Sequence, residues 1–145
     1  MAWKTLYWED TKEGEALPEA TREITATTVV SCAIASRDFT PLHHDPDAAV
    51  AAGLKDIFLN TPTIYGFAGK YLTDWTGPEG EIKQISLRLM MPALSGDTLT
   101  MSGKVARKYI DDKQHLVDIE FTFSLPTMPN CTGKATVELP TRVSE

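Results

Sequence analysis

The sequence predicts an α+β fold in which a curved antiparallel sheet wraps round one central helix. In the second half of the chain, apolar residues recur at every second position in four successive segments, which is the period of half-buried strands. A sheet with one apolar face needs a cover, and the most apolar helix pattern, at residues 66–75, precedes these segments. The 145 residues make about one domain of ordinary size, so we expect a single domain over residues 1–145.

The first elements along the chain alternate between loop, strand and helix patterns. A polar loop is expected at residues 14–18 and a β-leaning stretch at residues 21–27. Thr28 has the hydroxyl of a helix N-cap and stands directly before apolar residues at helical spacing. These residues predict one helix that ends just before Asp38.

Two further helices are predicted, and both carry capping residues. Asp45 and Pro46 are an N-cap and a first-turn proline, and they open a short helix at residues 48–52 that a glycine can close. The central helix at residues 66–75 ends at Gly77, with a proline just beyond it.

Four strands are predicted after residue 81. Turn residues at 95–97, at 110–113 and at 125–130 separate them, so we expect neighbours in sequence to pair in one antiparallel sheet. The alternating apolar positions are Ile85, Leu87, Leu89 and Met91, then Leu99, Met101, Gly103 and Val105, then Ile119, Phe121 and Phe123, and last Ala135, Val137 and Leu139.

Charge and composition argue against several classes of protein. The net charge is −6 and no run of Lys and Arg supplies a phosphate-binding patch, so no nucleic acid is expected as a partner. No apolar run approaches the roughly 20 residues that span a bilayer. Residues 1–4 lack the basic and apolar regions of a signal sequence. We therefore expect a cytoplasmic protein with no membrane contact.

The strongest chemical signal is the segment 38–46, which reads Asp-Phe-Thr-Pro-Leu-His-His-Asp-Pro. It sets the carboxylate of Asp38 and the imidazole of His43 five residues apart, and Pro41 between them has a fixed φ. A turn with few conformations loses little entropy when it orders. Histidine ordinarily changes charge near neutral pH, so the pair is suited to moving protons.

Three more motifs follow this segment in a fixed order. Residues 38–45 match the pattern Asp-Phe-Asn-Pro-Leu/Ile-His-x-Asp with Thr in place of Asn, and residues 62–67 loosely match Pro-Ile-Ala-His-Gly-Met. Residues 92–99 match Pro-x-x-x-Gly-Asp-Thr-Leu, and residues 133–140 match Gly-x-Ala-Thr-Val-x-Leu-Pro. Together they resemble the MaoC-like hydratases of the hot-dog fold, the (R)-specific enoyl-CoA hydratase group.

The resemblance implies an enoyl-CoA hydratase or 3-hydroxyacyl-CoA dehydratase with Asp38 and His43 as its catalytic pair. Adding water to a double bond conjugated with a thioester needs a base, an acid for the α-carbon and donors for the enolate-like oxygen. Gly66 is expected where the central helix begins and N–H groups point outward, so its amide is the candidate donor. Which of Asp38 and His43 is the acid stays open. No metal is expected, and no cofactor apart from the acyl-CoA substrate.

The stretch between His43 and Gly66 is longer than in simple bacterial hydratases. Residues 56–60, together with residues 71–75, are similar to the small MaoC-like subunits of actinobacterial steroid side-chain hydratases, which work with a second MaoC-like chain. This implies a homodimer or a heteromer with such a chain, and a bulky substrate such as a steroid side-chain thioester. The residues expected to bind the substrate are Ile57, Phe58, Asn60, Pro62 and Tyr65.

Other interpretations stay open on the sequence. Residues 57–59 could be ordinary core or interface residues, Gly66 could serve only close packing, and His44 beside the pair could indicate a metal ligand. The chain could instead be a non-catalytic subunit that completes a partner's pocket. It could also be a hot-dog thioesterase, although the acid of the central helix, Asp74, lies at its far end.

Overall fold

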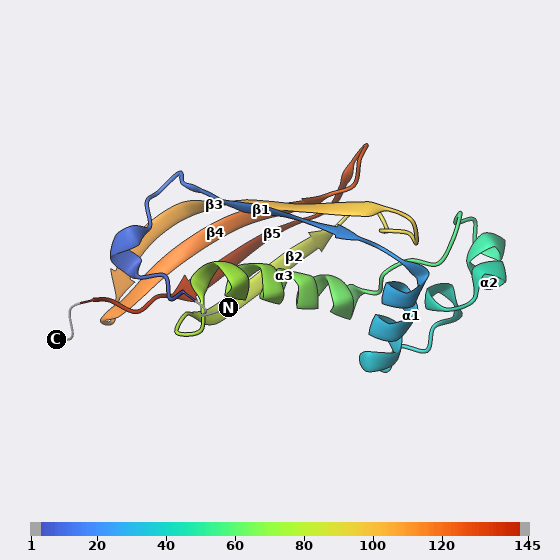
Figure 1. Ribbon diagram of the computed structural model, residues 1–145, viewed down its shortest axis with the longest axis horizontal. Helices are drawn as coiled ribbons and strands as arrows, with labels where there is room; N and C mark the ends of the chain where they lie inside the picture. The colour runs from blue at the N-terminus through green and yellow to red at the C-terminus, as the bar shows by residue number, and fades with distance from the viewer. Residues whose placement is uncertain (1–3, 143–145) are drawn as a thin grey trace.

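The computed structural model describes residues 4–142, which form one antiparallel sheet with a long helix along one face (Figure 1). This confirms the predicted α+β class and the sheet wrapped round a central helix. The strands are β1 (Ala16–Glu23), β2 (Glu81–Leu89), β3 (Thr98–Asp111), β4 (Gln114–Ser124) and β5 (Pro129–Glu138). The helices are α1 (Ala26–Ala35), α2 (Pro46–Ala51) and α3 (Thr61–Thr76), with 3₁₀ turns η1 (Trp8–Asp10) and η2 (Pro41–His43).

The order of strands in the sheet is β1-β3-β4-β5-β2. The expectation that β2 and β3 pair as neighbours is therefore wrong, because β2 pairs with β5 and β3 pairs with β1. The turn at residues 95–97 leads from one side of the sheet to the other. The predicted turn between β3 and β4 is confirmed as a tight hairpin, in which Asp112 and Lys113 have φ of 44° and 66°.

The edge strand β1 begins inside the stretch that was expected to be a loop. It contains Pro18, which has no N–H to give to a strand partner. The pairing with β3 shifts in register between Leu17 and Ala20, on either side of this proline. An edge strand with a bulge tolerates a proline, and this explains why the sequence pattern did not show the strand.

The helices begin at polar caps. The prediction that Thr28 caps α1 is wrong, because Oγ1 of Thr25 accepts a hydrogen bond from the N–H of Thr28. The cap of α2 is confirmed: a carboxylate oxygen of Asp45 accepts hydrogen bonds from two first-turn N–H groups. The central helix α3 begins five residues earlier than expected, after its cap Asn60.

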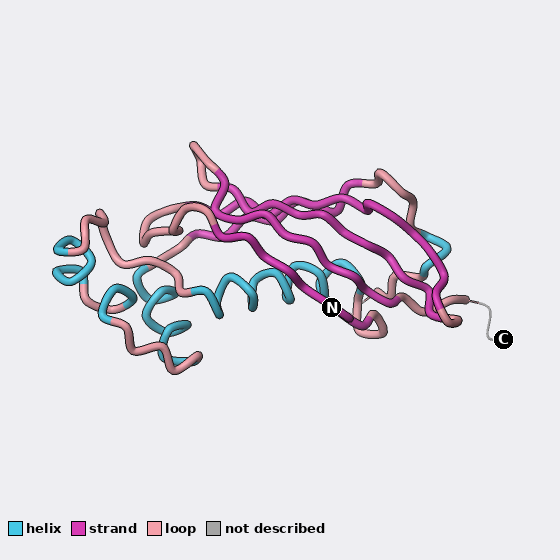
Figure 2. The backbone as a smooth tube through the Cα atoms, turned by 180° about the vertical axis from the view of Figure 1, so that it is seen from behind, coloured by secondary structure: helices cyan, strands magenta, loops and turns pink. Residues whose placement is uncertain are grey.

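The core lies between α3 and the sheet, where Ile64, Ala68 and Leu72 of the helix are buried. α1, η2 and α2 lie beyond the N-terminal end of α3, at one end of the molecule, as both views show (Figures 1 and 2). The connections that carry the predicted catalytic residues therefore gather at the N-terminal end of α3.

No helix within residues 4–142 is long and apolar enough to cross a membrane.

Candidate active site

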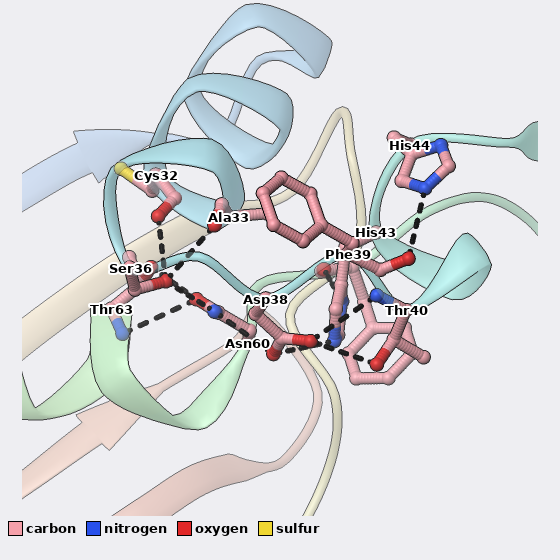
Figure 3. Close-up of polar contacts among 11 residues, drawn as sticks. Cys32, Ala33, Ser36, Asp38, Phe39, Thr40, His43, His44, Asn60 and Thr63 are labelled. Atoms are coloured by element: carbon pink, nitrogen blue, oxygen red, sulfur yellow. Dashed lines mark hydrogen bonds and ion pairs between the residues drawn. The ribbon is translucent and has the colours of Figure 1, made fainter.

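Asp38 and His43 face each other in the connection between α1 and α2 (Figure 3). Arg37, with φ of 55°, turns the chain after α1, and the N–H of Asp38 donates to the carbonyl oxygen of Ala33 at 2.9 Å. η2 turns the chain again and brings Nε2 of His43 to 3.4 Å from Oδ2 of Asp38. The structure thus brings together the two residues that the sequence singled out.

The imidazole of His43 is held in one orientation by Phe58. Its Nδ1 lies 2.8 Å from the carbonyl oxygen of Phe58, and the two rings meet edge to face with centroids 4.6 Å apart. A carbonyl oxygen only accepts hydrogen bonds, so Nδ1 carries a proton and donates it. In the neutral imidazole, Nε2 is then an acceptor, and it is the nitrogen that faces Asp38.

The carboxylate of Asp38 accepts three hydrogen bonds. The hydroxyl of Thr40 donates to Oδ1 at 2.8 Å and its N–H at 3.3 Å, while Nδ2 of Asn60 donates to Oδ2 at 3.1 Å. The hydroxyl of Thr40, followed by the amide of Asn60, lowers the pKa of Asp38 below its ordinary value of 3.8. Asp38 is therefore a carboxylate at neutral pH.

A water molecule that lies beside the two groups can bind to both. In the neutral form of His43, Nε2 and the carboxylate of Asp38 are both acceptors, and their 3.4 Å separation exceeds the roughly 2.7–2.9 Å of a charge-assisted hydrogen bond. A water molecule can donate one hydrogen bond to each acceptor. The side chain of His43 is 7% exposed and that of Asp38 is 27% exposed, so such a molecule would be reached from the carboxylate's side. The pair can activate water for addition.

Asn60 has a different place from the one that the sequence suggested. It was expected to bind substrate, but it is 2% exposed and its amide donates to Asp38 and to Oγ of Ser36. Its Oδ1 caps α3 through the N–H of Thr63 and also accepts from the hydroxyl of Thr63. Asn60 therefore fixes Asp38 to the start of α3. Ser36 and Thr63 were missed, although an Asn two residues before a proline is a recognisable helix-start signal.

Gly66 does not begin the central helix, so that prediction is wrong. It is the sixth residue of α3, where a regular helix pairs each N–H with the carbonyl oxygen four residues earlier. A Cβ added at Gly66 would meet no atom within 4 Å, and the same is true at Gly69. Close packing against the sheet therefore does not explain either glycine. The surface at Gly66 is open, and its role toward a thioester stays a prediction.

The other expected substrate-binding residues lie in three different environments. Ile57 is 2% exposed and belongs to the core, which agrees with the alternative that it is an ordinary core residue. Phe58 is half-buried against His43. Pro62 and Tyr65 are exposed, on the side of α3 away from the core, where Gly66 also lies. The structure thus places Phe58 beside His43, and Pro62, Tyr65 and Gly66 on an open surface.

The described residues offer no arrangement for a metal ion. Within residues 4–142, no group of three or more His, Cys, Asp or Glu side chains is placed to hold one. Nε2 of His44 lies 3.2 Å from the carbonyl oxygen of Phe39, which turns this ring away from the catalytic pair. Asp74 forms an exposed ion pair with Lys70 at 2.6 Å, at the far end of α3 from Asp38.

Comparisons with known proteins agree on one family. Residues 9–136 match the model of the MaoC like domain. A curated relative, the 3-oxo-4,17-pregnadiene-20-carboxyl-CoA hydratase beta subunit of Mycobacterium tuberculosis, is 50% identical over 92 residues, which are 63% of this chain and 71% of the relative.

Solved structures show the same fold. A chain of the ChsH1-ChsH2 complex from M. tuberculosis is 39% identical with a TM-score of 0.82, covering 89% of this chain and 98% of the other. The (R)-hydratase from A. caviae involved in PHA biosynthesis is 21% identical with a TM-score of 0.81, over 91% and 99% of the two chains, and supports the hot-dog fold alone. Because the family model covers most of the sequence, this chain belongs to the MaoC-like domain family.

Proposed function

We propose that the chain is a hydro-lyase that adds water to a trans-2-enoyl-CoA thioester or removes it from the 3-hydroxyacyl-CoA. The observation that carries this is the pairing of Asp38 with an imidazole whose Nδ1–H is bound to the carbonyl oxygen of Phe58. That bond leaves Nε2 free to take a proton from water. Membership of the MaoC-like family supports the same chemistry.

The reaction follows from these positions. A water molecule held by Asp38 and His43 loses a proton to Nε2 while its oxygen attacks the β-carbon. The electron pair of the double bond moves to the α-carbon and the thioester oxygen, and the α-carbon then takes a proton from the pair. The positive end of α3 is the candidate place for the thioester oxygen, with the open surface at Gly66 beside it. Water is added across the double bond with no cofactor.

A bulky acyl group is the second part of the proposal. The relative that is 50% identical is named for a pregnadiene-carboxyl-CoA substrate, and that name supports a steroid side-chain thioester here. We expect kcat/KM for such a thioester to exceed that for crotonyl-CoA, because discrimination is differential binding of the transition state. A higher kcat/KM for crotonyl-CoA, in every assembly that the chain forms, would contradict the bulky acyl group. Residues 57–59, which the sequence suggested for the acyl pocket, would then serve packing only.

The catalytic pair is tested by Asp38→Asn and His43→Asn. Each should lower the hydration rate, followed by loss of enoyl absorbance, by roughly 100-fold or more, as expected for loss of general acid–base catalysis. The double variant should cost little more than either change alone, because the two residues act together.

Matched controls stand next to the pair and along α3. His44→Asn makes the same change one residue away, and Asp74→Asn makes it at the far end of α3; both should keep activity within a few-fold. Activity of Asp38→Asn or His43→Asn within a few-fold of wild type would overturn the assignment. Release of free thiol from a saturated acyl-CoA, abolished by Asp74→Asn, would instead select the thioesterase.

A partner subunit is the second candidate function. The similar solved chain is part of a two-component complex, and the curated relative is named a beta subunit. The edges of the sheet, β1 and β2, are available for association. We expect at least a dimer in sedimentation at micromolar concentration, with itself or with a second MaoC-like chain. If a co-expressed complex is active and keeps full activity with Asp38→Asn, this chain completes the partner's pocket and does not catalyse.

A further inference from the structure

A cavity of about 290 Å³ is lined in part by Phe58, the residue that holds the imidazole of His43. Its wall is mostly apolar and comes from the segment before α3, the first turn of α3 and the end of β2. Phe58 is part of this wall and also contacts the pair, since its carbonyl oxygen lies 2.8 Å from Nδ1 of His43. A group bound in the cavity would therefore lie one residue away from the imidazole.

Asn130 is the polar residue of this wall whose bonding is incomplete. It is 3% exposed, and its Nδ2 donates to the carbonyl oxygen of Met91 at 2.6 Å. Because a carbonyl oxygen cannot donate, this contact fixes which way the amide faces. The remaining atom, Oδ1, is buried and has no hydrogen-bond partner among the described residues. A buried acceptor without a donor is unfavourable, so Oδ1 is suited to a ligand that brings one.

The mouth of the cavity is apolar and exposed. Leu89, Met90 and Met91 are 45%, 49% and 43% exposed, and all three line the cavity. Long unbranched methionine side chains adapt to the shape of an aliphatic ligand. The backbone is held beside them, since the N–H of Met90 donates to the carbonyl oxygen of Asn130 at 2.8 Å. The site therefore combines adaptable apolar walls with one fixed acceptor.

The missing donor distinguishes the two parts of an acyl-CoA. An enoyl group has no polar hydrogen, and a ring ketone is an acceptor, so neither can pair with Oδ1 of Asn130. The 3-hydroxyl group of a 3-hydroxyacyl-CoA is a donor, but it must lie at Asp38 and His43 to react. The thiol arm of CoA is an aliphatic chain that carries amide N–H groups, the nearest of them a short ethylene spacer from the sulfur. When the thioester lies at the catalytic pair, this arm is the part of the substrate that matches both the walls and the acceptor.

We propose that this cavity binds the thiol arm of the substrate and that Oδ1 of Asn130 accepts a hydrogen bond from an arm amide. The inference rests on the proposed function, because it takes the substrate to be a CoA thioester. Asn130 is then a positioning residue that sets how far the thioester reaches toward Asp38 and His43.

The test compares two trans-2-enoyl thioesters with the same acyl group, one of pantetheine and one of an alkanethiol that has no amide. Both are assayed with wild type, with Asn130→Leu and with the control Thr132→Val, an exposed position two residues along the same strand. Asn130→Leu should lower kcat/KM for the pantetheine ester by roughly tenfold, mainly through KM, and change the alkyl ester little. Thr132→Val should change neither.

The two levels of the argument fail in different ways. An equal loss for both esters in Asn130→Leu would show a structural role only. If wild type does not prefer the pantetheine ester, the inference is overturned whether or not the variant folds, and a bound water that satisfies Oδ1 would give this result. If wild type hydrates neither ester, the proposed function fails. Binding of a non-reactive pantetheine thioether to wild type and Asn130→Leu then decides the inference separately, with unchanged affinity overturning it.

Discussion

At the scale of single residues, the site depends on which groups donate hydrogen bonds to the carboxylate of Asp38. The hydroxyl of Thr40 comes from the same turn, whereas the amide of Asn60 comes from the start of α3. Both favour the charged carboxylate, and the bond from His43 to the carbonyl oxygen of Phe58 fixes the other half of the pair. The geometry of the pair is thus set by hydrogen-bonding groups from two segments, the turn after α1 and the residues that lead into α3.

Thr40→Val should change how the reaction depends on pH. The hydroxyl of Thr40 is the largest cause that lowers the pKa of Asp38, so its removal should raise that pKa. Activity that needs the carboxylate is lost as pH falls through the pKa of Asp38, so the most acid step in the acid limb of kcat/KM should move to higher pH. The profile of kcat/KM against pH measures this.

Thr40→Ser is the matched control, because it keeps the hydroxyl and should leave the acid limb in place. The alkaline limb should be the same in both variants. An acid limb that does not move in Thr40→Val would show that ionisation of Asp38 does not control activity.

At the scale of elements, the two ends of α3 were not equally visible in the sequence. Its C-terminal end was predicted from Gly77, because glycine readily takes the positive φ that often ends a helix. In the structure this φ is 75°. The beginning of the helix was not predicted, because Thr61, Pro62 and Thr63 have weak helix propensity. Proline is tolerated in a first turn, and Asn60 supplies the cap that holds this turn.

Gly77→Ala and Gly53→Ala should destabilise the fold to different extents. Both glycines have positive φ, of 75° and 88°, but a Cβ at Gly77 would lie 2.3 Å from the carbonyl oxygen of Lys4, whereas at Gly53 it would meet nothing within 4 Å. Gly53→Ala should cost about 1–2 kcal/mol of unfolding free energy from backbone strain alone. Gly77→Ala should cost more, as the chain near Lys4 must also move. Urea unfolding with an unchanged slope measures both, and equal costs would contradict the close contact.

At the scale of the whole molecule, the core is built from both faces that meet between α3 and the sheet. Cys131 on β5 is fully buried in it, and burial raises the pKa of this thiol from 9.0 to about 11. A pKa that is raised in the folded state gives stability that is present below the ordinary pKa and is lost as pH rises.

The fold should therefore lose roughly 3 kcal/mol of unfolding free energy through Cys131 between pH 9 and 11, at about 1.4 kcal/mol per pKa unit. Cys131→Ala should be less stable at neutral pH, because it leaves a cavity, but its stability should fall less across this range. Cys32→Ala, which removes the other free and only half-buried cysteine, is the matched comparison. An identical slope in Cys131→Ala would show that this thiol does not titrate with unfolding.

The sequence by itself determined the features that depend on neighbours along the chain. Period-two apolar patterns predicted four strands, and Asp45 and Gly77 marked helix ends. The proline-containing turn indicated that Asp38 and His43, five residues apart, lie close together. Each of these is a local choice of backbone conformation, which side-chain chemistry at nearby positions decides.

Only the tertiary structure decided what meets across long separations. It separated β2 from β3 in the sheet, and it brought Asn60 to Asp38 across 22 positions and Asn130 to Met91 across 39. Such contacts depend on how the sheet closes round α3, and no spacing along the chain encodes them. The sequence therefore singled out Asp38 and His43, whereas the fold determined which residues hold them in place and formed the cavity that Phe58 lines.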